Sequence, residues 1–128
     1  MQEYIIKGSN KGVRGSVDIS GPKNSCLPLL ASSILFEDTV IFKNIPLTTD
    51  VLTMAKLLEA LGSKVEISEK NKSIKIINKK KHKLIVPYKL VSTMRAGVLT
   101  MGALLGRYQK KQISVSYTHL TLPTILLV

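Results

Sequence analysis

The chain has 128 residues, with nineteen Lys and Arg against eight Asp and Glu, which gives a formal net charge of +11. Hydrophobic residues make up 45%, which suits one globular domain and excludes collagen-like, low-complexity and wholly disordered classes. No apolar run approaches the ~18 residues of a membrane-spanning helix, and the sequence from Met1 to Lys7 lacks the pattern of a signal peptide. We therefore expect a cytoplasmic protein without membrane contact. The single cysteine, Cys26, excludes an intrachain disulfide and a cysteine-rich metal site.

The positive charge is concentrated in the second half of the chain. All eight acidic residues lie at or before Glu69, and seven of the sixteen lysines fall between Lys70 and Lys83. Such a block can bind the phosphates of a nucleic acid. However, apolar residues alternate over 73–77 as in a strand with one solvated face, and aromatic residues for base stacking are only 5% of the chain. The sequence favours a solvated β-hairpin, with a small basic nucleic-acid-binding protein as the alternative.

The hydrophobic pattern predicts the order β-α-β-α-β-β between residues 13 and 78. The predicted elements are a strand over 13–19, a helix over about 26–36, a buried strand over 39–42, a helix over about 51–61, and strands over 64–67 and 73–77. Asn24 or Ser25 is expected to cap the first helix, and Thr48, Thr49 or Asp50 the second, which Gly62 should end in a left-handed conformation.

A second unit is expected to begin after this one. Residues 84–86 predict a short strand, and apolar residues at spacings of three and four from Leu90 to Leu105 predict the longest helix, ending at Gly106. Strands and helices in this order indicate the α/β class, with helices packed on sheets.

Two places in the sequence are candidates for binding an anion. Lys23 and Asn24 follow the turn after the first strand, at the N-terminus of a predicted helix, where backbone amides and the helix dipole favour negative charge. The alternative there is a capped helix with a solvated lysine. Arg95 lies within a predicted helix that is otherwise nearly free of charge, so it either faces water or holds a phosphate or carboxylate.

The remaining reactive residues are weaker candidates. Cys26 lies at a helix start, where a thiolate is favoured, but a small packing residue is the preferred interpretation. His82 lies within the lysine block and His119 in a Thr- and Leu-rich tail, and no acidic residue follows Glu69 to pair with either. We assign no catalytic role to the two histidines.

Several motifs resemble the enolpyruvyl transferase family, and within it the UDP-N-acetylglucosamine 1-carboxyvinyltransferases. The resemblance covers roughly residues 2–113 and rests on VDISGPKNSCLP at 17–28, NIP at 44–46, DV at 50–51, LLEALG at 57–62 and PYKLVSTMRA at 87–96. The sister family of the shikimate pathway has Lys-Ser in place of Lys23-Asn24, which favours the amino-sugar branch. A fragment of the shikimate-pathway enzyme remains the alternative within the family.

The resemblance implies an inside-out α/β barrel of repeated β-α-β-α-β-β units, of which about one and a half are present. Residues 1–20 would then supply strands to the other domain of the full enzyme, and residues 21–114 would form part of one domain. Residues 115–128 differ from the family, since VSYTHLTLPT at 115–124 resembles translated adapter sequence from sequencing libraries. We therefore interpret 115–128 as a non-native tail.

The resemblance also implies a reaction and its site. The family transfers the enolpyruvyl group of phosphoenolpyruvate to the 3-hydroxyl of UDP-N-acetylglucosamine, the first committed step of peptidoglycan synthesis, without a metal or organic cofactor. Lys23, Asn24 and Arg95 match family positions that bind the two substrates. The family's general acid is a cysteine in a Pro-Gly-Gly-Cys loop that is not in this sequence, and Cys26 does not match it. We therefore expect no catalytic residue, and no activity, in this chain alone.

Overall fold

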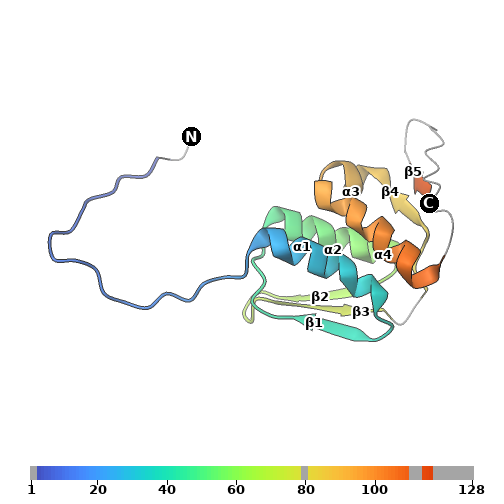
Figure 1. Ribbon diagram of the computed structural model, residues 1–128, viewed down its shortest axis with the longest axis horizontal. Coiled ribbons are helices and arrows are strands. Elements are labelled where there is room, and N and C mark those ends of the chain that lie inside the picture. Colours follow the sequence, from blue (N-terminus) through green and yellow to red (C-terminus); the bar gives the residue numbers. More distant parts are fainter. Residues whose placement is uncertain (1–2, 79–80, 110–113, 117–128) are drawn as a thin grey trace.

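The computed structural model describes residues 3–78, 81–109 and 114–116 (Figure 1). In chain order the elements are α1 (Lys23–Ser32), the 3-10 turn η1 (Ser33–Leu35), β1 (Thr39–Phe42), α2 (Thr49–Leu61), β2 (Lys64–Ser68), β3 (Ser73–Ile77), β4 (Ile85–Pro87), α3 (Tyr88–Ser92), the 3-10 turn η2 (Arg95–Val98), α4 (Leu99–Tyr108) and β5 (Ser114–Ser116). None of the described helices is long and apolar enough to cross a membrane.

The main sheet is antiparallel and has the order β1-β3-β2. Ile74 and Ile76 of the central strand β3 are fully buried, which explains the alternation in the sequence. The predicted strand over 39–42 forms, but the prediction that it is buried is wrong. Ile41 lies opposite Lys75 on the face of the sheet away from the core and is 57% exposed, whereas Val40 and Phe42, opposite the buried Ile76 and Ile74, are half-buried.

The helices lie over one face of this sheet, and α1 packs against both α2 and α4 (Figure 1). The face of α2 that the spacing predicted is buried in the core, with Val51, Met54, Leu58 and Leu61 all at 0% exposure. Gly62 ends this helix with φ of 117°, as expected for a left-handed C-terminal residue.

The two helix starts differ in part from the prediction. α1 begins at Lys23, three residues earlier than expected, and Pro22 occupies the N-cap position without a side-chain hydrogen bond. Asn24 and Ser25 are therefore helical residues and not caps. Thr48 is the N-cap of α2, as predicted, but its side chain makes no capping hydrogen bond either. Proline can begin α1 because its carbonyl accepts the Cys26 amide at 3.1 Å and its missing N–H removes a donor.

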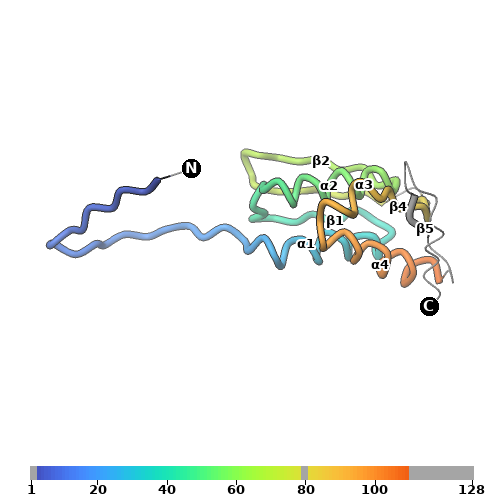
Figure 2. The backbone as a smooth tube through the Cα atoms, turned by 90° about the horizontal axis from the view of Figure 1, so that it is seen from above, coloured from blue at the N-terminus to red at the C-terminus, as the bar shows by residue number. Residues whose placement is uncertain are grey.

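The prediction of a strand over 13–19 is wrong for this chain. Residues 3–22 run away from the body as an extended segment with no assigned strand (Figures 1 and 2). Val13, Val17 and Ile19 are each more than 80% exposed. A strand requires a neighbour for its backbone groups, and no described residue pairs with this segment over 13–18. A contact at its end is the hydrogen bond from Asn44 Nδ2 to the Ile19 carbonyl, 3.1 Å.

The predicted long helix over 90–105 is also wrong, because the chain breaks at Met94. Met94 has φ of −146° and ψ of 116°, which separates α3 from η2 and α4. The longest described helix is instead α2, with 13 residues. The break lets α3 pack against α2 while α4 packs against α1 and η1, which one straight helix would not do. The buried side chain of Met94, 5% exposed, fixes the bend in the core.

The last described strand, β5, pairs with β4 in parallel, with Val86 opposite Val115. Val115 and Ser116, the first two residues of the predicted non-native tail, therefore take part in the fold. The rest of that tail, 117–128, lies outside the described residues, as does His119.

Candidate functional site

A cavity of about 390 Å³ lies where the N-terminal ends of α1, α2 and η2 converge. It is lined by Lys23 and Asn24 from α1, by Asp50 from α2, and by residues 93–96 around the bend between α3 and η2. The three residues that the sequence singled out, Lys23, Asn24 and Arg95, thus line one cavity although Arg95 is distant in sequence. The break at Met94, which the sequence did not predict, places Arg95 there as the first residue of η2.

The start of α1 gives this cavity a positive electrostatic character. The first turn of α1 contains no acidic residue, and its N-cap Pro22 supplies no side-chain acceptor for the helix amides. An anion is favoured at such an end by the helix dipole, and the Lys23 ammonium adds a full charge. The cavity therefore has the chemistry of a site for a phosphate or carboxylate.

Asp50 is the member of the cavity whose role the sequence did not reveal. Lys23 Nζ donates a hydrogen bond to Asp50 Oδ2 at 2.7 Å, and the two side chains are 45% and 40% exposed. The sequence suggested Asp50 as a helix cap and as part of the DV motif, but not as a partner of Lys23. A useful signal was available, since Lys23 and Asp50 lie in the first turns of two successive helices, α1 and α2, which pack side by side.

Arg95 lies at the mouth of the cavity with an exposed side chain. The neighbouring Met94 is buried and holds the bend, so the guanidinium is presented to solvent from a fixed backbone position. The two alternatives for Arg95, facing water or holding an anion, are compatible, because a solvated arginine at a cavity mouth is available for an incoming phosphate or carboxylate.

Cys26 is a core residue in this structure, as the preferred interpretation had it. Its side chain is 4% exposed, and burial raises the pKa of the thiol, so the thiolate is disfavoured. Within the described ranges, no three His, Cys, Asp or Glu side chains gather closely enough to hold a metal ion.

Comparison with known proteins identifies the family. Residues 7–121 match the family described as EPSP synthase (3-phosphoshikimate 1-carboxyvinyltransferase). The chain belongs to this family. The match extends over residues 115–121, which belong to the predicted non-native tail. Curated relatives named UDP-N-acetylglucosamine 1-carboxyvinyltransferase are 43% identical in Magnetococcus marinus, 40% in Aliivibrio salmonicida and 41% in Coxiella burnetii. Each alignment covers 115 residues, 90% of this chain.

The chain spans only about a quarter of the length of these relatives, 26% to 27%. Its fold is similar to a crystal structure of the enolpyruvyl transferase NikO from Streptomyces tendae, with a TM-score of 0.66 at 19% identity over 74% of this chain and 22% of that one. The resemblance stated from the motifs is therefore confirmed, and the nucleic-acid alternative is not favoured. The described residues form a mixed α/β part of that fold, and they do not by themselves close a barrel.

Proposed function

We propose that this chain is part of an enzyme that transfers the enolpyruvyl group of phosphoenolpyruvate to the 3-hydroxyl of UDP-N-acetylglucosamine in the cytoplasm, for peptidoglycan synthesis. The observation that carries the proposal is the convergence of Lys23, Asn24 and Arg95 on one cavity at a helix N-terminus. The amino-sugar branch is favoured because the curated relatives at 40% to 43% identity have that name. Asn24, in place of the serine of the shikimate branch, supports the same choice.

In this proposal the residues of the chain bind and stabilise negative charge. The sugar hydroxyl oxygen adds to the substituted vinyl carbon of phosphoenolpyruvate, while a proton is added to its methylene carbon. The tetrahedral intermediate then loses phosphate and a proton to restore the double bond. Lys23 and Arg95 would hold the phosphate or the carboxylate, and the fixed positions of their charges would favour the intermediate over the separate substrates. Asn24 would contribute an amide donor or acceptor toward a substrate.

The chain by itself is proposed to lack this activity. The general acid that the resemblance implies is not among its residues, and Lys23, Asp50 and Arg95 of the cavity lining are exposed to water. Proximity, acid catalysis and exclusion of water each contribute orders of magnitude to an enzyme's rate. Half a site therefore retains at most weak anion binding.

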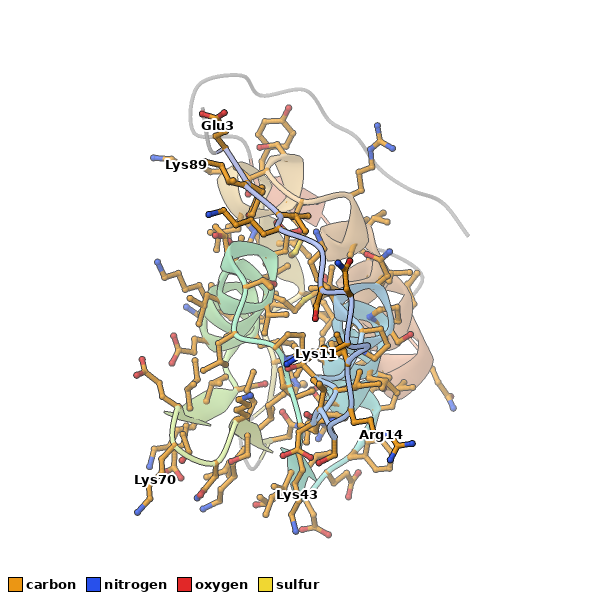
Figure 3. The ribbon with its side chains drawn as sticks, turned by 90° about the vertical axis from the view of Figure 1, so that its left-hand side faces the viewer. Glu3, Lys11, Arg14, Lys43, Lys70 and Lys89 are labelled. Atoms are coloured by element: carbon orange, nitrogen blue, oxygen red, sulfur yellow. The ribbon has the colours of Figure 1, made fainter. Side chains whose placement is uncertain are left out.

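The test is an assay of phosphate release with both substrates, on this chain and on a version extended by its natural downstream sequence. We expect turnover by the extended enzyme only, and a loss of about 100-fold or more for Lys23→Ala or Arg95→Ala. Lys70→Ala is the matched control, because Figure 3 shows Lys70 at the far end of the hairpin, pointing away from the body. Unchanged turnover in Lys23→Ala and Arg95→Ala would refute the site assignment.

A second acceptor substrate separates the two branches of the family. Shikimate 3-phosphate replaces the UDP-sugar in the same assay of the extended enzyme. Phosphate release with the UDP-sugar alone supports the proposal. Release with shikimate 3-phosphate alone would assign the chain to the other branch.

A further inference from the structure

A buried polar cluster lies where the end of β3, residues 81–83 and the C-terminal ends of α2 and α4 meet. It consists of Ser63, Asn78, His82 and Tyr108, and its first three members are at most 6% exposed. Ser63 Oγ lies 2.7 Å from Asn78 Oδ1 and 2.8 Å from His82 Nε2, and the second imidazole nitrogen, Nδ1, lies 2.7 Å from the Tyr108 hydroxyl. The cluster is distinct from the cavity of Lys23 and Arg95.

The hydrogen-bond partners determine where the protons lie. Asn78 Nδ2 donates to the Ser33 carbonyl at 2.7 Å, so the oxygen Oδ1 faces the cluster and accepts from Ser63 Oγ. Since Ser63 uses its only proton for that bond, the serine oxygen accepts from His82 Nε2–H, which also lies 3.2 Å from the acceptor Asn78 Oδ1. The Tyr108 oxygen accepts the backbone N–H of His82 at 2.9 Å, and its proton is then available for the unprotonated Nδ1. With neutral His82, both ring nitrogens, the Ser63 hydroxyl and the Tyr108 hydroxyl each have a hydrogen-bond partner in this scheme.

We propose that Ser63, Asn78, His82 and Tyr108 form an acid-sensitive lock that fastens the end of α4 to the loop beyond β3, closed by neutral His82 and opened when His82 gains a proton. A proton on Nδ1 would face the Tyr108 hydroxyl, which already accepts the His82 backbone amide. The Tyr108 proton would then lose its acceptor, in a cluster where an unpaired polar group is costly.

The positively charged residues around His82 also oppose its protonation. From α4, Arg107 faces the cluster together with Tyr108, and its guanidinium carbon lies 5.3 Å from the centre of the Tyr108 ring. Lys81 and Lys83 flank His82 in the chain. Ser63, which follows the end of α2, and Asn78, which follows β3, are neutral. Burial, and secondly the charge of Arg107, lowers the pKa of His82 below its usual value of 6.5.

The contacts of Arg107 indicate which part of α4 loosens when the lock opens. Its guanidinium donates to the carbonyls of Ile34 and Phe36, both at 2.8 Å, so the last turn of α4 is held to the η1 segment on one side and to His82 on the other. Opening the His82 side leaves the arginine contacts in place. We therefore expect local loosening of the last turn of α4 and of the 81–83 loop, with α2 and the main sheet retained.

Stability follows from the sign of the pKa shift. The folded pKa of His82 is below the unfolded one, so the contribution of the lock is fully present above about pH 6.5 and declines as the pH falls through the folded pKa. Between the two values the unfolding equilibrium constant should rise by up to about tenfold per pH unit. His82→Gln, which has no ionisable group, should show a much smaller slope over the same range.

The test is a pH titration of this chain by NMR, in a His119→Gln background that leaves His82 as the sole histidine. We expect the imidazole nitrogen shifts of the Nε2–H tautomer at neutral pH and a midpoint below 6.5. Tyr108→Phe, which removes the donor to Nδ1, should raise that midpoint. A midpoint at or above 6.5, a mixture of tautomers, or an unchanged midpoint in Tyr108→Phe would overturn the proposal.

Hydrogen exchange distinguishes a local lock from a general loss of stability. Protection factors, which correct for the intrinsic pH dependence of exchange, are compared on either side of the midpoint. We expect the His82 amide and the last turn of α4 to lose their protection on acidification at a pH at which residues 54–61 of α2 are still protected. Loss of protection in both regions at the same pH would contradict the lock.

Discussion

Lys23 and Asp50 are 27 residues apart in sequence, yet their side chains form an ion pair of 2.7 Å at the edge of the cavity. The pair joins the first turns of α1 and α2. Since both side chains are about 40% exposed, the pair contributes little to stability, about 1 kcal/mol or less. Its larger effect is on the cavity, where the Asp50 carboxylate offsets the charge that Lys23 would present to an anion.

Asp50→Asn should therefore strengthen the binding of phosphoenolpyruvate to this chain. Removing the carboxylate leaves the Lys23 charge for the ligand, and we expect the dissociation constant to fall by about two- to fivefold, the size of an exposed charge pair. Amide shifts of residues 23–27, followed by NMR during a titration with phosphoenolpyruvate, measure the change. The free energy of unfolding should alter by less than about 1 kcal/mol.

Glu59→Gln is the matched control for this prediction. Glu59 is an exposed acid on the same helix α2 and does not line the cavity, so it changes the net charge equally. An equal gain in both variants would attribute the effect to net charge alone. Weaker binding in Asp50→Asn would show instead that Asp50 orients Lys23 for the ligand.

Gly62 is the position where the backbone most clearly requires glycine. Its φ of 117° is costly for a residue with a Cβ, so Gly62→Ala should lower the free energy of unfolding by about 1–2 kcal/mol. Gly102 lies within α4, and no atom outside its own helix turn lies within 4 Å of the place that a Cβ would take. Gly102→Ala should therefore be neutral or stabilising by up to about 1 kcal/mol. Urea denaturation followed by circular dichroism compares the two, and an equal loss in both would refute the argument.

The sequence predicted well those elements whose buried residues recur at the regular spacing of a helix or a strand. The stripe of α2 and the alternation of β3 each fit one period and end at a turn signal, and both are observed. The strand over 13–19 has the same alternation but no neighbour in the described residues. Alternation indicates what a segment would bury if paired, whereas pairing depends on residues far away in the sequence.

The break at Met94 had no local signal, since the spacing of three and four continues across it. It results from tertiary packing, because the two halves of the segment contact different helices. The same limit applies to the site. Lys23 and Arg95 were predicted separately from residue chemistry, but their common cavity depends on that break. The His82 cluster was missed because a histidine between lysines suggests a solvated loop, and Tyr108 lies 26 residues further along the chain.

The lysine-rich hairpin should not bind nucleic acid. Lys64 and Lys75 both pair with Glu66, at 2.8 and 3.2 Å, and Figure 3 shows Lys70 pointing away from the body. No basic groove with stacking aromatics accompanies them in the part of the hairpin that the structure describes. Titration with single-stranded and duplex DNA at ~150 mM salt should give dissociation constants weaker than micromolar and a steep loss with added salt. Sub-micromolar binding that survives added salt would contradict this prediction.

The last prediction concerns the C-terminal residues, where two deletions distinguish the contribution of β5 from that of residues 117–128. Removal of 117–128 should leave the thermal midpoint unchanged and reduce aggregation, because this uncharged apolar segment is prone to strand pairing and we assign it no native role. Removal of 114–128 also removes β5, and with it the backbone partner of β4, whose Val86 is fully buried. At about 1 kcal/mol per hydrogen bond, we expect this longer deletion to lower the free energy of unfolding by about 1–3 kcal/mol.

Thermal and urea unfolding of both deletions, with light scattering as the measure of aggregation, check the prediction. A clear loss of stability in the shorter deletion would show that residues beyond Ser116 pack on the domain, and the interpretation of a non-native tail would then fail for them. Equal stability of the two deletions would show that β5 contributes nothing to holding β4. The expected difference between the two would show that β5 stabilises the domain, although Val115 and Ser116 belong to the segment that the sequence analysis interprets as a non-native tail.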